Sequence, residues 1–374
     1  MIAGGRAARE FVRRDVGAAL VPWVVARVLV IGALAMTRYG LDGLVAERPE
    51  PLRQGLFAWD AAFYRAIAED GYATARESLR FFPLVPLLAR GLGVVFAGND
   101  AFALLVVANL SALLFGALLH RLALRETGDP ALAVRAAWFG ALFPPLLTLV
   151  MGYAEATALM LAAAMFLALR DRRWGWAIPA GILAGLARPA GPLLVVPAAI
   201  EAARGWRSAG GRERVARVGA VVSPGVGTGL YLAWTGLAHD DAWLPFRLQN
   251  ETSRRGGFAN PVTRVIDGVG DLFGGDRFGS GLHIVWAALF VALIVVLARR
   301  LPSSYAAYAG VTVGLGLAAE NLDSFERYAA GAFPLVLAVA ILTDRRDVER
   351  PALVLSGAGL VGYAMLAFLG RYVP

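Results

Sequence analysis

Long apolar runs are the feature that most restricts what this sequence can fold into. A membrane-spanning helix needs about 20 consecutive apolar residues. Apolar residues make up 58% of the chain and charged residues 17%, whereas an average soluble domain is about 25% charged. A water-soluble core cannot bury this much apolar surface, so the sequence predicts an all-α polytopic membrane protein with one integral membrane domain over residues 1–374. We expect about eleven transmembrane helices, at residues 16–36, 101–119, 133–151, 154–169, 177–187, 191–203, 218–236, 281–298, 303–319, 328–343 and 351–369.

Arginine placement predicts the orientation of these helices. The chain has a formal net charge of +8 and contains no lysine. Because short loops rich in basic residues stay in the cytoplasm, placing every arginine cluster there gives a consistent alternation with the N-terminus inside and the C-terminus outside. The first apolar run lacks a clear cleavage site and is expected to remain as the first span. The clusters lie at residues 6–14, 120–125, 170–173, 204–217, 299–300 and 345–350.

Composition excludes several classes of site. The chain has no cysteine, so disulfides, thiolate nucleophiles and cysteine-ligated metals are excluded. The three histidines, His120, His239 and His283, are too scattered for a zinc motif. His239 with the following Asp240 and Asp241 is interpreted as part of a solvated loop. We therefore expect no metal and no cofactor. The basic residues follow topology, so no nucleic-acid partner is predicted.

Two long polar loops interrupt the apolar runs on the predicted outer face. The first external loop covers residues 37–100 and the second covers residues 237–280. The predicted inner loops are short, and long loops in a compact protein commonly carry function. This asymmetry predicts chemistry on the outer, extracytoplasmic face.

The first external loop contains a segment with helical periodicity, at residues 57–72. The pattern predicts an amphipathic helix that lies in the membrane interface and ends at Gly71. Asp60 and Tyr64 fall on the face beside the apolar stripe. A carboxylate at the membrane surface can act as a general base, but periodicity alone equally allows Asp60 to solvate the helix edge or to pair with an arginine. The apolar stripe consists of Leu56, Trp59, Phe63 and Ile67.

Several short blocks carry a family resemblance. They are residues 57–72 around Trp59-Asp60, then Phe81-Phe82-Pro83, Gly152-Tyr153-Ala154-Glu155-Ala156, Leu186-Ala187-Arg188-Pro189-Ala190-Gly191, Ser324-Phe325-Glu326-Arg327-Tyr328 and Phe333-Pro334-Leu335, with Gln249, Arg254, Arg255 and Pro261 as a looser match. In this order, over about residues 55–340, the chain resembles the PIG-V-type mannosyltransferases of the GT-C class. These are the second mannosyltransferase of GPI-anchor assembly and its bacterial relatives.

The resemblance implies a GT-C-like helical bundle with interfacial helices in the long first external loop. It implies a lipid-phosphate-mannose donor and an active site on the non-cytoplasmic face. It also implies that the first-loop acid, Asp60, is the catalytic base. The lysine-free composition, rich in alanine and arginine, is typical of a GC-rich bacterium, so we expect a bacterial plasma-membrane protein whose acceptor is not a GPI intermediate.

A polyprenyl phosphate is a good leaving group, so such a reaction needs one base for the acceptor hydroxyl and fixed positive charge for the phosphate. The candidate residues for binding the phosphate are Arg327, Arg188 and Arg80. Arg327 and Arg80 could equally be interfacial residues that anchor the helices at the membrane surface. Arg188, at a turn between two short apolar arms, also fits an ion pair within the bundle. Glu155 fits either an acceptor contact or an arginine partner. Arg27, in the middle of the first span, is expected to form a structural pair.

The function predicted is transfer of mannose from polyprenyl-phosphate-mannose to a lipid-linked or glycolipid acceptor, with inversion at the anomeric carbon. Three alternatives remain open. They are a GT-C enzyme for another polyprenyl-phosphate sugar, such as arabinose or galactofuranose, a transporter or flippase for a lipid-linked sugar, and a non-catalytic subunit of another glycosyltransferase. The predicted substrate-binding residues are Arg327, Arg188, Arg80, Glu155, Tyr64, Trp59, Gln249 and Tyr328.

Overall fold

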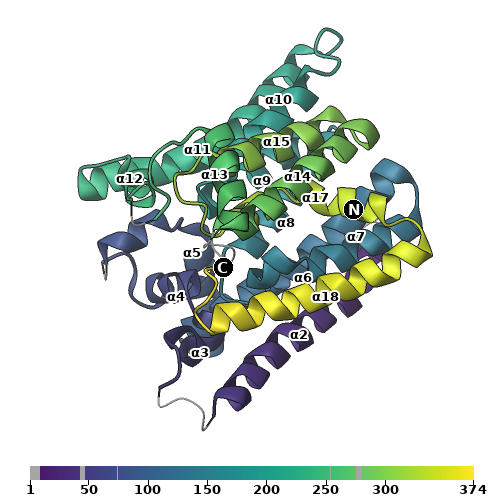
Figure 1. The fold of residues 1–374 in the computed structure, drawn as a ribbon. Helices are drawn as coiled ribbons and strands as arrows, with labels where there is room; N and C mark the ends of the chain where they lie inside the picture. Colours follow the sequence, from purple (N-terminus) through teal and green to yellow (C-terminus); the bar gives the residue numbers. More distant parts are fainter. Residues whose placement is uncertain (1–8, 43–46, 74, 253, 275–279) are drawn as a thin grey trace. The chain divides into compact units, whose positions relative to one another are not determined.

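The computed structural model describes residues 9–42, 47–73, 75–252, 254–274 and 280–374. The described residues are helical apart from loops and one isolated β-bridge between Phe258 and Ala319. The chain divides into two compact units, and their helices are labelled in Figure 1. Unit 1 comprises Met1–Gly71, Val85–Ala163 and Val339–Pro374, and unit 2 comprises Tyr72–Leu84 and Ala164–Ala338.

Unit 1 is built around the long helices α2, α6 and α18, with the shorter α7 packed against all three. Local signals mark the helix ends. Asn99 accepts a hydrogen bond from the backbone N–H of Phe102 at the start of α6, and Gly128 ends this helix in the left-handed conformation, at φ +69°. The elements are η1 (Phe11–Val16), α2 (Gly17–Leu41), α3 (Glu50–Gln54), η2 (Gly55–Phe57), α4 (Asp60–Asp70), α5 (Leu84–Gly93), η4 (Val94–Phe96), α6 (Asp100–Thr127), α7 (Pro130–Leu142), η5 (Pro144–Leu149), α8 (Glu155–Arg170) and α18 (Arg346–Phe368).

Unit 2 contains the middle of the chain, and α8 and the next-to-last helix α17 each contribute residues to both units. Its largest packing interface joins α9 to α11. The elements are η3 (Arg76–Arg80), α9 (Trp174–Ala187), η6 (Gly191–Leu194), α10 (Val195–Ala203), α11 (Gly211–His239), α12 (Leu244–Gln249), α13 (Pro261–Phe273), α14 (Ser280–Arg300), α15 (Ser303–Leu317), α16 (Phe325–Ala330) and α17 (Pro334–Leu342).

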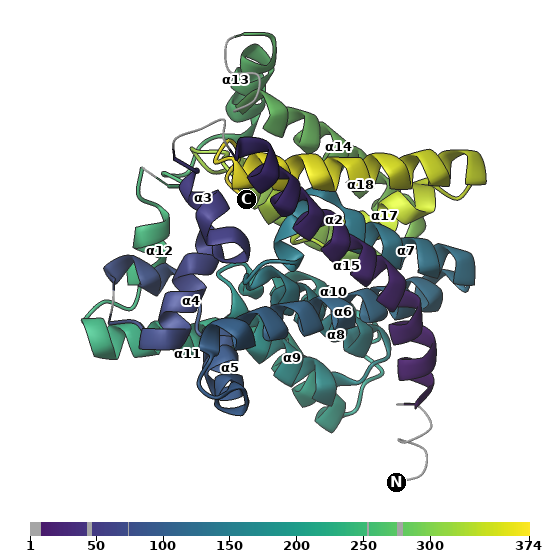
Figure 2. The same ribbon diagram turned by 90° about the horizontal axis from the view of Figure 1, so that it is seen from below.

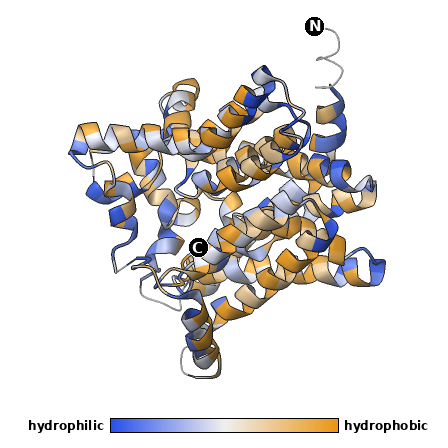
Figure 3. Cartoon of the chain, turned by 90° about the horizontal axis from the view of Figure 1, so that it is seen from above, coloured by the Kyte–Doolittle hydropathy of each residue, from blue (hydrophilic) through white to orange (hydrophobic). Residues whose placement is uncertain are grey.

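Five helical segments of the described chain are long and apolar enough to cross a membrane. Apolar residues run along both units, while hydrophilic residues gather at helix ends and loops (Figure 3). The other six predicted runs fall on shorter helices of 9 to 16 residues, and even 16 residues rise only about 24 Å against a hydrocarbon core of about 30 Å. Five spans are therefore supported, and the count of about eleven stays a prediction. The five segments are Phe11–Leu41, Asp100–Thr127, Gly211–His239, Gly281–Arg300 and Arg346–Phe368.

Arg27 lies in the middle of the first span and is satisfied inside unit 1. Its Nε donates a hydrogen bond to Oδ1 of Asn109 at 2.8 Å, and its Nη2 donates to the backbone oxygen of Leu149 at 2.8 Å. Because a charge in an apolar layer must be paired or hydrogen-bonded, these contacts account for Arg27 as a structural residue. The partners are an amide and a carbonyl, rather than the charged partner that an ion pair would need.

Glycines allow α9 and α11 to approach closely in unit 2. A Cβ atom added at Gly185 would lie 2.1 Å from the backbone oxygen of Pro224, and one at Gly227 would lie 2.0 Å from that of Ile182. Small residues at helix contacts permit this backbone proximity within membranes. The turn that carries Arg188 directly follows α9, so this interface supports its position.

Gly185→Ala is therefore expected to destabilise unit 2. The added methyl group meets backbone atoms that cannot rotate away, and overpacking of this kind costs about 1–3 kcal/mol. Gly175→Ala, on the same helix, is the matched control because nothing lies within 4 Å of its added Cβ. Thermal unfolding in mild detergent measures both. Equal unfolding temperatures for the two variants would contradict the close approach of α9 and α11.

Candidate functional site

Asp60 occupies a distinctive position in unit 1, as the first residue of α4. The preceding Trp59 has φ +60° and ψ −129°, a strained conformation for a residue with a side chain. The Trp59 indole Nε1 donates a hydrogen bond to the backbone oxygen of Ala367 at 3.1 Å, and the backbone N–H of Asp60 donates to the Tyr153 hydroxyl at 3.2 Å. Backbone strain that is held by specific contacts is common at functional sites. Here the strained turn fixes the position of Asp60, which is half-buried, at the start of α4.

The first-loop helix differs from the prediction in where it begins and which face is buried. It starts at Asp60, so Leu56 and Trp59 precede it rather than extend its stripe. Tyr64, expected beside Asp60 on the polar face, is only 4% exposed, while Phe63 is half-buried. The strained turn at Trp59, which periodicity does not reveal, shifts the register of the buried face. That face consists of Ala61, Tyr64, Ile67 and Ala68.

The segment before α8 packs against the Asp60 turn. The backbone N–H of Gly152 donates a hydrogen bond to the backbone oxygen of Leu56 at 3.1 Å, next to the contact between Tyr153 and Asp60. Glu155 is the first residue of α8 and is 2% exposed. Unit 1 thus brings the block at Gly152-Tyr153-Ala154-Glu155-Ala156 to the same place as the Trp59-Asp60 block.

Three arginines surround one aromatic ring in unit 2, that of Tyr328 on α16. The distances from the guanidinium carbon to the ring centroid are 4.3 Å for Arg255, 4.7 Å for Arg327 and 5.6 Å for Arg188. Nη2 of Arg327 also donates a hydrogen bond to the Tyr328 hydroxyl at 3.1 Å. We call these four residues the Tyr328 cluster. Each arginine gains from a cation–π contact, and their like charges favour an anion among them.

Arg255 lies outside the membrane-spanning segments, and its pKa is lowered mainly by burial and further by the neighbouring positive charges. Burial lowers it, the Tyr328 hydroxyl raises it, and the nearby Arg327 and Arg188 guanidinium groups lower it further. Each lowering cause disfavours the charged form of Arg255. A bound phosphate would reverse this effect, because an opposite charge favours the protonated guanidinium.

A pocket of about 350 Å³ lies beside Arg255 in unit 2. It is lined by the loop at residues 246–258, by the turn after Arg188 and by residues at the end of α15. Amide groups of Gln249 and Asn250 give it hydrogen-bonding capacity, and Phe246 gives it an aromatic wall. Its volume lies within the range of about 300–1,000 Å³ typical of small-molecule sites. A charged side, amides and a ring together suit a sugar phosphate.

Backbone contacts hold Arg255 in this position. The backbone N–H of Asn321 donates a hydrogen bond to the backbone oxygen of Arg255 at 3.0 Å, and that of Gly257 donates to Oε2 of Glu320 at 2.9 Å. Gly256 has φ +67°, and a Cβ there would lie 2.5 Å from the Glu320 carboxylate. The glycine is therefore required for the loop to fold onto the segment before α16.

The described parts of the two long loops also meet within unit 2. Nη2 of Arg254 lies 2.6 Å from Oε2 of Glu77. Tyr231, on α11 rather than in a loop, also contacts the first loop, because its hydroxyl donates a hydrogen bond to the backbone oxygen of Leu79 at 2.7 Å. Arg80 stacks on Phe81, with 4.5 Å from its guanidinium carbon to the ring centroid. Arg80 is therefore not counted as a member of the Tyr328 cluster.

Apart from Arg80, the predicted site residues fall into two groups. Asp60, Trp59, Tyr64 and Glu155 belong to unit 1. Arg188, Arg327 and Tyr328 form the Tyr328 cluster with Arg255, and Gln249 shares the pocket with Arg255. Arg255 was not assigned a role from the sequence. The only signal for it was the pair Arg254-Arg255 before Gly256-Gly257 in the loosely matching second loop.

The sequence matches no protein-family model and no curated protein. In structure the chain is similar to the oligosaccharyltransferase of Archaeoglobus fulgidus. For the complex of that protein with zinc and sulfate, the TM-score is 0.46 and the identity 13%, covering 95% of this chain and 53% of the other. For the complex with an inhibitory peptide and a dolichol-phosphate, the TM-score is 0.45 and the identity 12%, covering 95% and 56%. This chain spans about half the length of that protein, and a TM-score below 0.5 assigns it neither substrate nor activity.

Proposed function

We propose that this chain is a membrane glycosyltransferase that uses a sugar joined through one phosphate to a polyprenol. The sugar is mannose and the acceptor is a lipid-linked glycan or glycolipid on the extracytoplasmic face. The observation that carries the proposal is the Tyr328 cluster, in which three arginines from separate elements surround one ring beside a polar pocket. The choice of mannose rests on the resemblance of the sequence blocks to PIG-V-type enzymes.

The arginines would hold the phosphate as the glycosidic bond breaks. Negative charge grows on the leaving polyprenyl phosphate, and preorganised donors aimed at developing charge are commonly the largest catalytic contribution. Planar guanidinium groups suit this task because each can donate two parallel hydrogen bonds to phosphate oxygens. Gln249, in the neighbouring pocket, supplies an amide for sugar hydroxyls.

Asp60 is the proposed base. It would take the proton of the acceptor hydroxyl as the oxygen attacks the anomeric carbon. The phosphate leaves without protonation, so one carboxylate suffices. A single displacement inverts the anomeric centre, and a β-linked donor therefore gives an α-linked product. The role of Asp60 rests on the sequence, and the strained turn at Trp59 supports it.

Incubation of the purified protein with radiolabelled polyprenyl-phosphate-mannose and a total membrane-lipid extract tests the proposal. Label should move from the donor into a more polar lipid, and mild acid should no longer release it as free mannose. Labelled arabinose or galactofuranose donors run in parallel identify the sugar. A donor that stays intact with every lipid fraction would overturn the assignment.

Topology gives a second prediction, because the proposal needs both long loops on one side of the membrane. A cysteine introduced after Arg170 should react with thiol reagents only from the cytoplasmic side, whereas cysteines at Glu77 and Asn260 should react from outside. The native chain has no cysteine, so each label reports one site. Cytoplasmic labelling at Asn260 would contradict the arginine-based orientation.

A further inference from the structure

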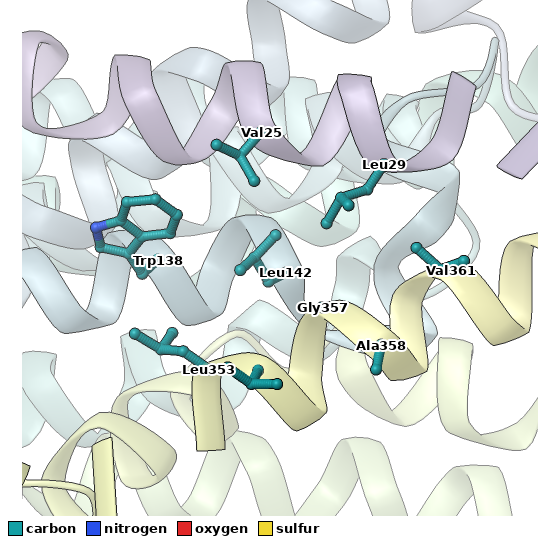
Figure 4. Close-up of a pocket in the computed structure, with 9 residues that line it drawn as sticks. Val25, Leu29, Trp138, Leu142, Leu353, Gly357, Ala358 and Val361 are labelled. Atoms are coloured by element: carbon teal, nitrogen blue, oxygen red, sulfur yellow. The ribbon is translucent and has the colours of Figure 1, made fainter. Parts of the chain in front are cut away.

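An open apolar groove lies in unit 1 between α2, α7 and α18, far in sequence from the Tyr328 cluster (Figure 4). These three helices pack against one another (Figure 2). The groove has a volume of about 620 Å³, within the range of about 300–1,000 Å³ typical of ligand sites. Helices α2 and α18 both belong to the candidate membrane spans, so the groove opens on membrane-spanning helices.

The walls of the groove are almost wholly apolar. Among the described residues that line it, the indole nitrogen of Trp138 is the only polar side-chain atom. The small residues Gly357 and Ala358 leave space for a ligand on the α18 side of the groove. A Cβ added at Gly357 would lie 3.5 Å from Leu29, which is an ordinary contact distance. Ala358 is exposed within the groove. Such walls suit a hydrocarbon chain rather than a polar ligand.

One end of the groove is basic. Along α18 the groove is lined by Leu353, Val354, Gly357, Ala358 and Val361. Arg350 precedes Leu353 and Val354 by three and four residues, and Arg346 precedes Arg350 by four. On a helix these spacings continue one face. Trp138 lies at the same end as Leu353, away from Val361 (Figure 4).

The acidic residues around the start of α18 are already paired with other arginines. Nη2 of Arg135 lies 2.7 Å from Asp344 and its Nη1 lies 3.7 Å from Glu349, while Arg345 binds Asp347 at 2.8 Å. Arg346 and Arg350 are exposed, and no ion pair engages either of them within the described chain. Two unneutralised cations thus stand at the end of a hydrocarbon-lined groove.

We propose that this groove binds an anionic phospholipid. One acyl chain lies between α2, α7 and α18, the phosphate meets Arg350 and Arg346, and the Trp138 indole lies at the level of the ester groups, where tryptophan is favoured. The match is of charge as well as shape, because basic residues next to an apolar membrane surface recruit anionic lipids. A zwitterionic lipid would fill the same groove without using the two arginines.

Native mass spectrometry of the detergent-solubilised protein, titrated with phosphatidylglycerol or phosphatidylcholine of identical acyl chains, tests the site. We expect one phosphatidylglycerol to bind preferentially. Arg346→Gln with Arg350→Gln should weaken it by about fivefold for each arginine removed. Ala358→Phe fills the groove and should abolish the preferential site. Leu355→Phe, on an exposed part of α18 outside the groove, is the matched control and should bind as the wild type does.

Three results would overturn the proposal. One is equal binding of the two lipids, which would mean ordinary solvation of the helices by the bilayer. Another is unchanged phosphatidylglycerol binding in Ala358→Phe. The third is displacement of the lipid by a second copy of the chain, seen as a dimer that Ala358→Phe dissociates. Circular dichroism of each variant separates loss of the site from loss of the fold.

Discussion

Asp60→Asn is expected to lower turnover by about 10²–10⁴-fold, the range that a positioned general base contributes. The amide keeps the size of the side chain and leaves the backbone contact from Asp60 to Tyr153 in place, so α4 should begin at the same residue. The carboxylate that would accept the proton of the acceptor hydroxyl is lost. Turnover is measured with saturating donor and acceptor, alongside binding of the donor lipid, which should be unchanged.

Asp70→Asn is the matched control for this variant. Asp70 is the last residue of the same helix and is exposed, so the same chemical change there should leave turnover near that of the wild type. Near wild-type turnover in Asp60→Asn would show that the Trp59 turn is a scaffold. The base would then have to be sought at Glu69, Asp70 or Glu155, and the Asp70→Asn variant already tests the second of these.

Arg255→Ala is expected to weaken both donor binding and turnover. A charged hydrogen bond to phosphate is worth about 1.5–3 kcal/mol, or about 10–100-fold. The loss should be larger in kcat/KM than in donor affinity, because negative charge on the phosphate grows in the transition state. Arg255 is a better probe than Arg327, which is 2% exposed and whose removal risks the fold. Arg255→Lys should recover part of the loss if the contact is a point charge, and little if it is bidentate.

The neighbouring arginine provides the control. Arg254→Ala removes the same charge from the same loop but breaks the contact with Glu77 instead of one in the Tyr328 cluster. Donor affinity in Arg254→Ala should stay within about twofold of the wild type, because Arg254 pairs with Glu77 and Glu251 rather than with the Tyr328 ring. Equal losses in both variants would mean that the loop, rather than the Tyr328 cluster, accounts for the effect.

Hydrophobic patterning predicted the class of protein well. All eleven apolar runs fall on helices. Such runs can be read directly from the sequence, because the segments that are excluded from water are continuous stretches of apolar residues. Patterning did not give helix lengths. Run 133–151, for example, is divided into α7, which ends at Leu142, and the separate short element η5. The glycines that let α9 approach α11 carry no periodic signal.

The candidate site was only partly predictable for a similar reason. Arg327 directly precedes Tyr328, but Arg188 is far from both in the sequence, and only tertiary packing brings it to the Tyr328 ring. Arg255 depends on a loop shaped by Gly256 and Glu320, which no local pattern encodes. The register of α4 was misjudged because a positive φ at Trp59 is rare for a residue with a side chain and cannot be read from spacing.

The stoichiometry of donor consumption tests the central claim most directly. Purified protein in sealed proteoliposomes is supplied with labelled polyprenyl-phosphate-mannose and acceptor lipid, and both free polyprenyl phosphate and labelled glycolipid are counted. The account predicts one polyprenyl phosphate released for each sugar transferred, with both yields falling together in Asp60→Asn and Arg255→Ala. Movement of intact donor across the bilayer, with no polyprenyl phosphate released, would contradict it and identify a transporter.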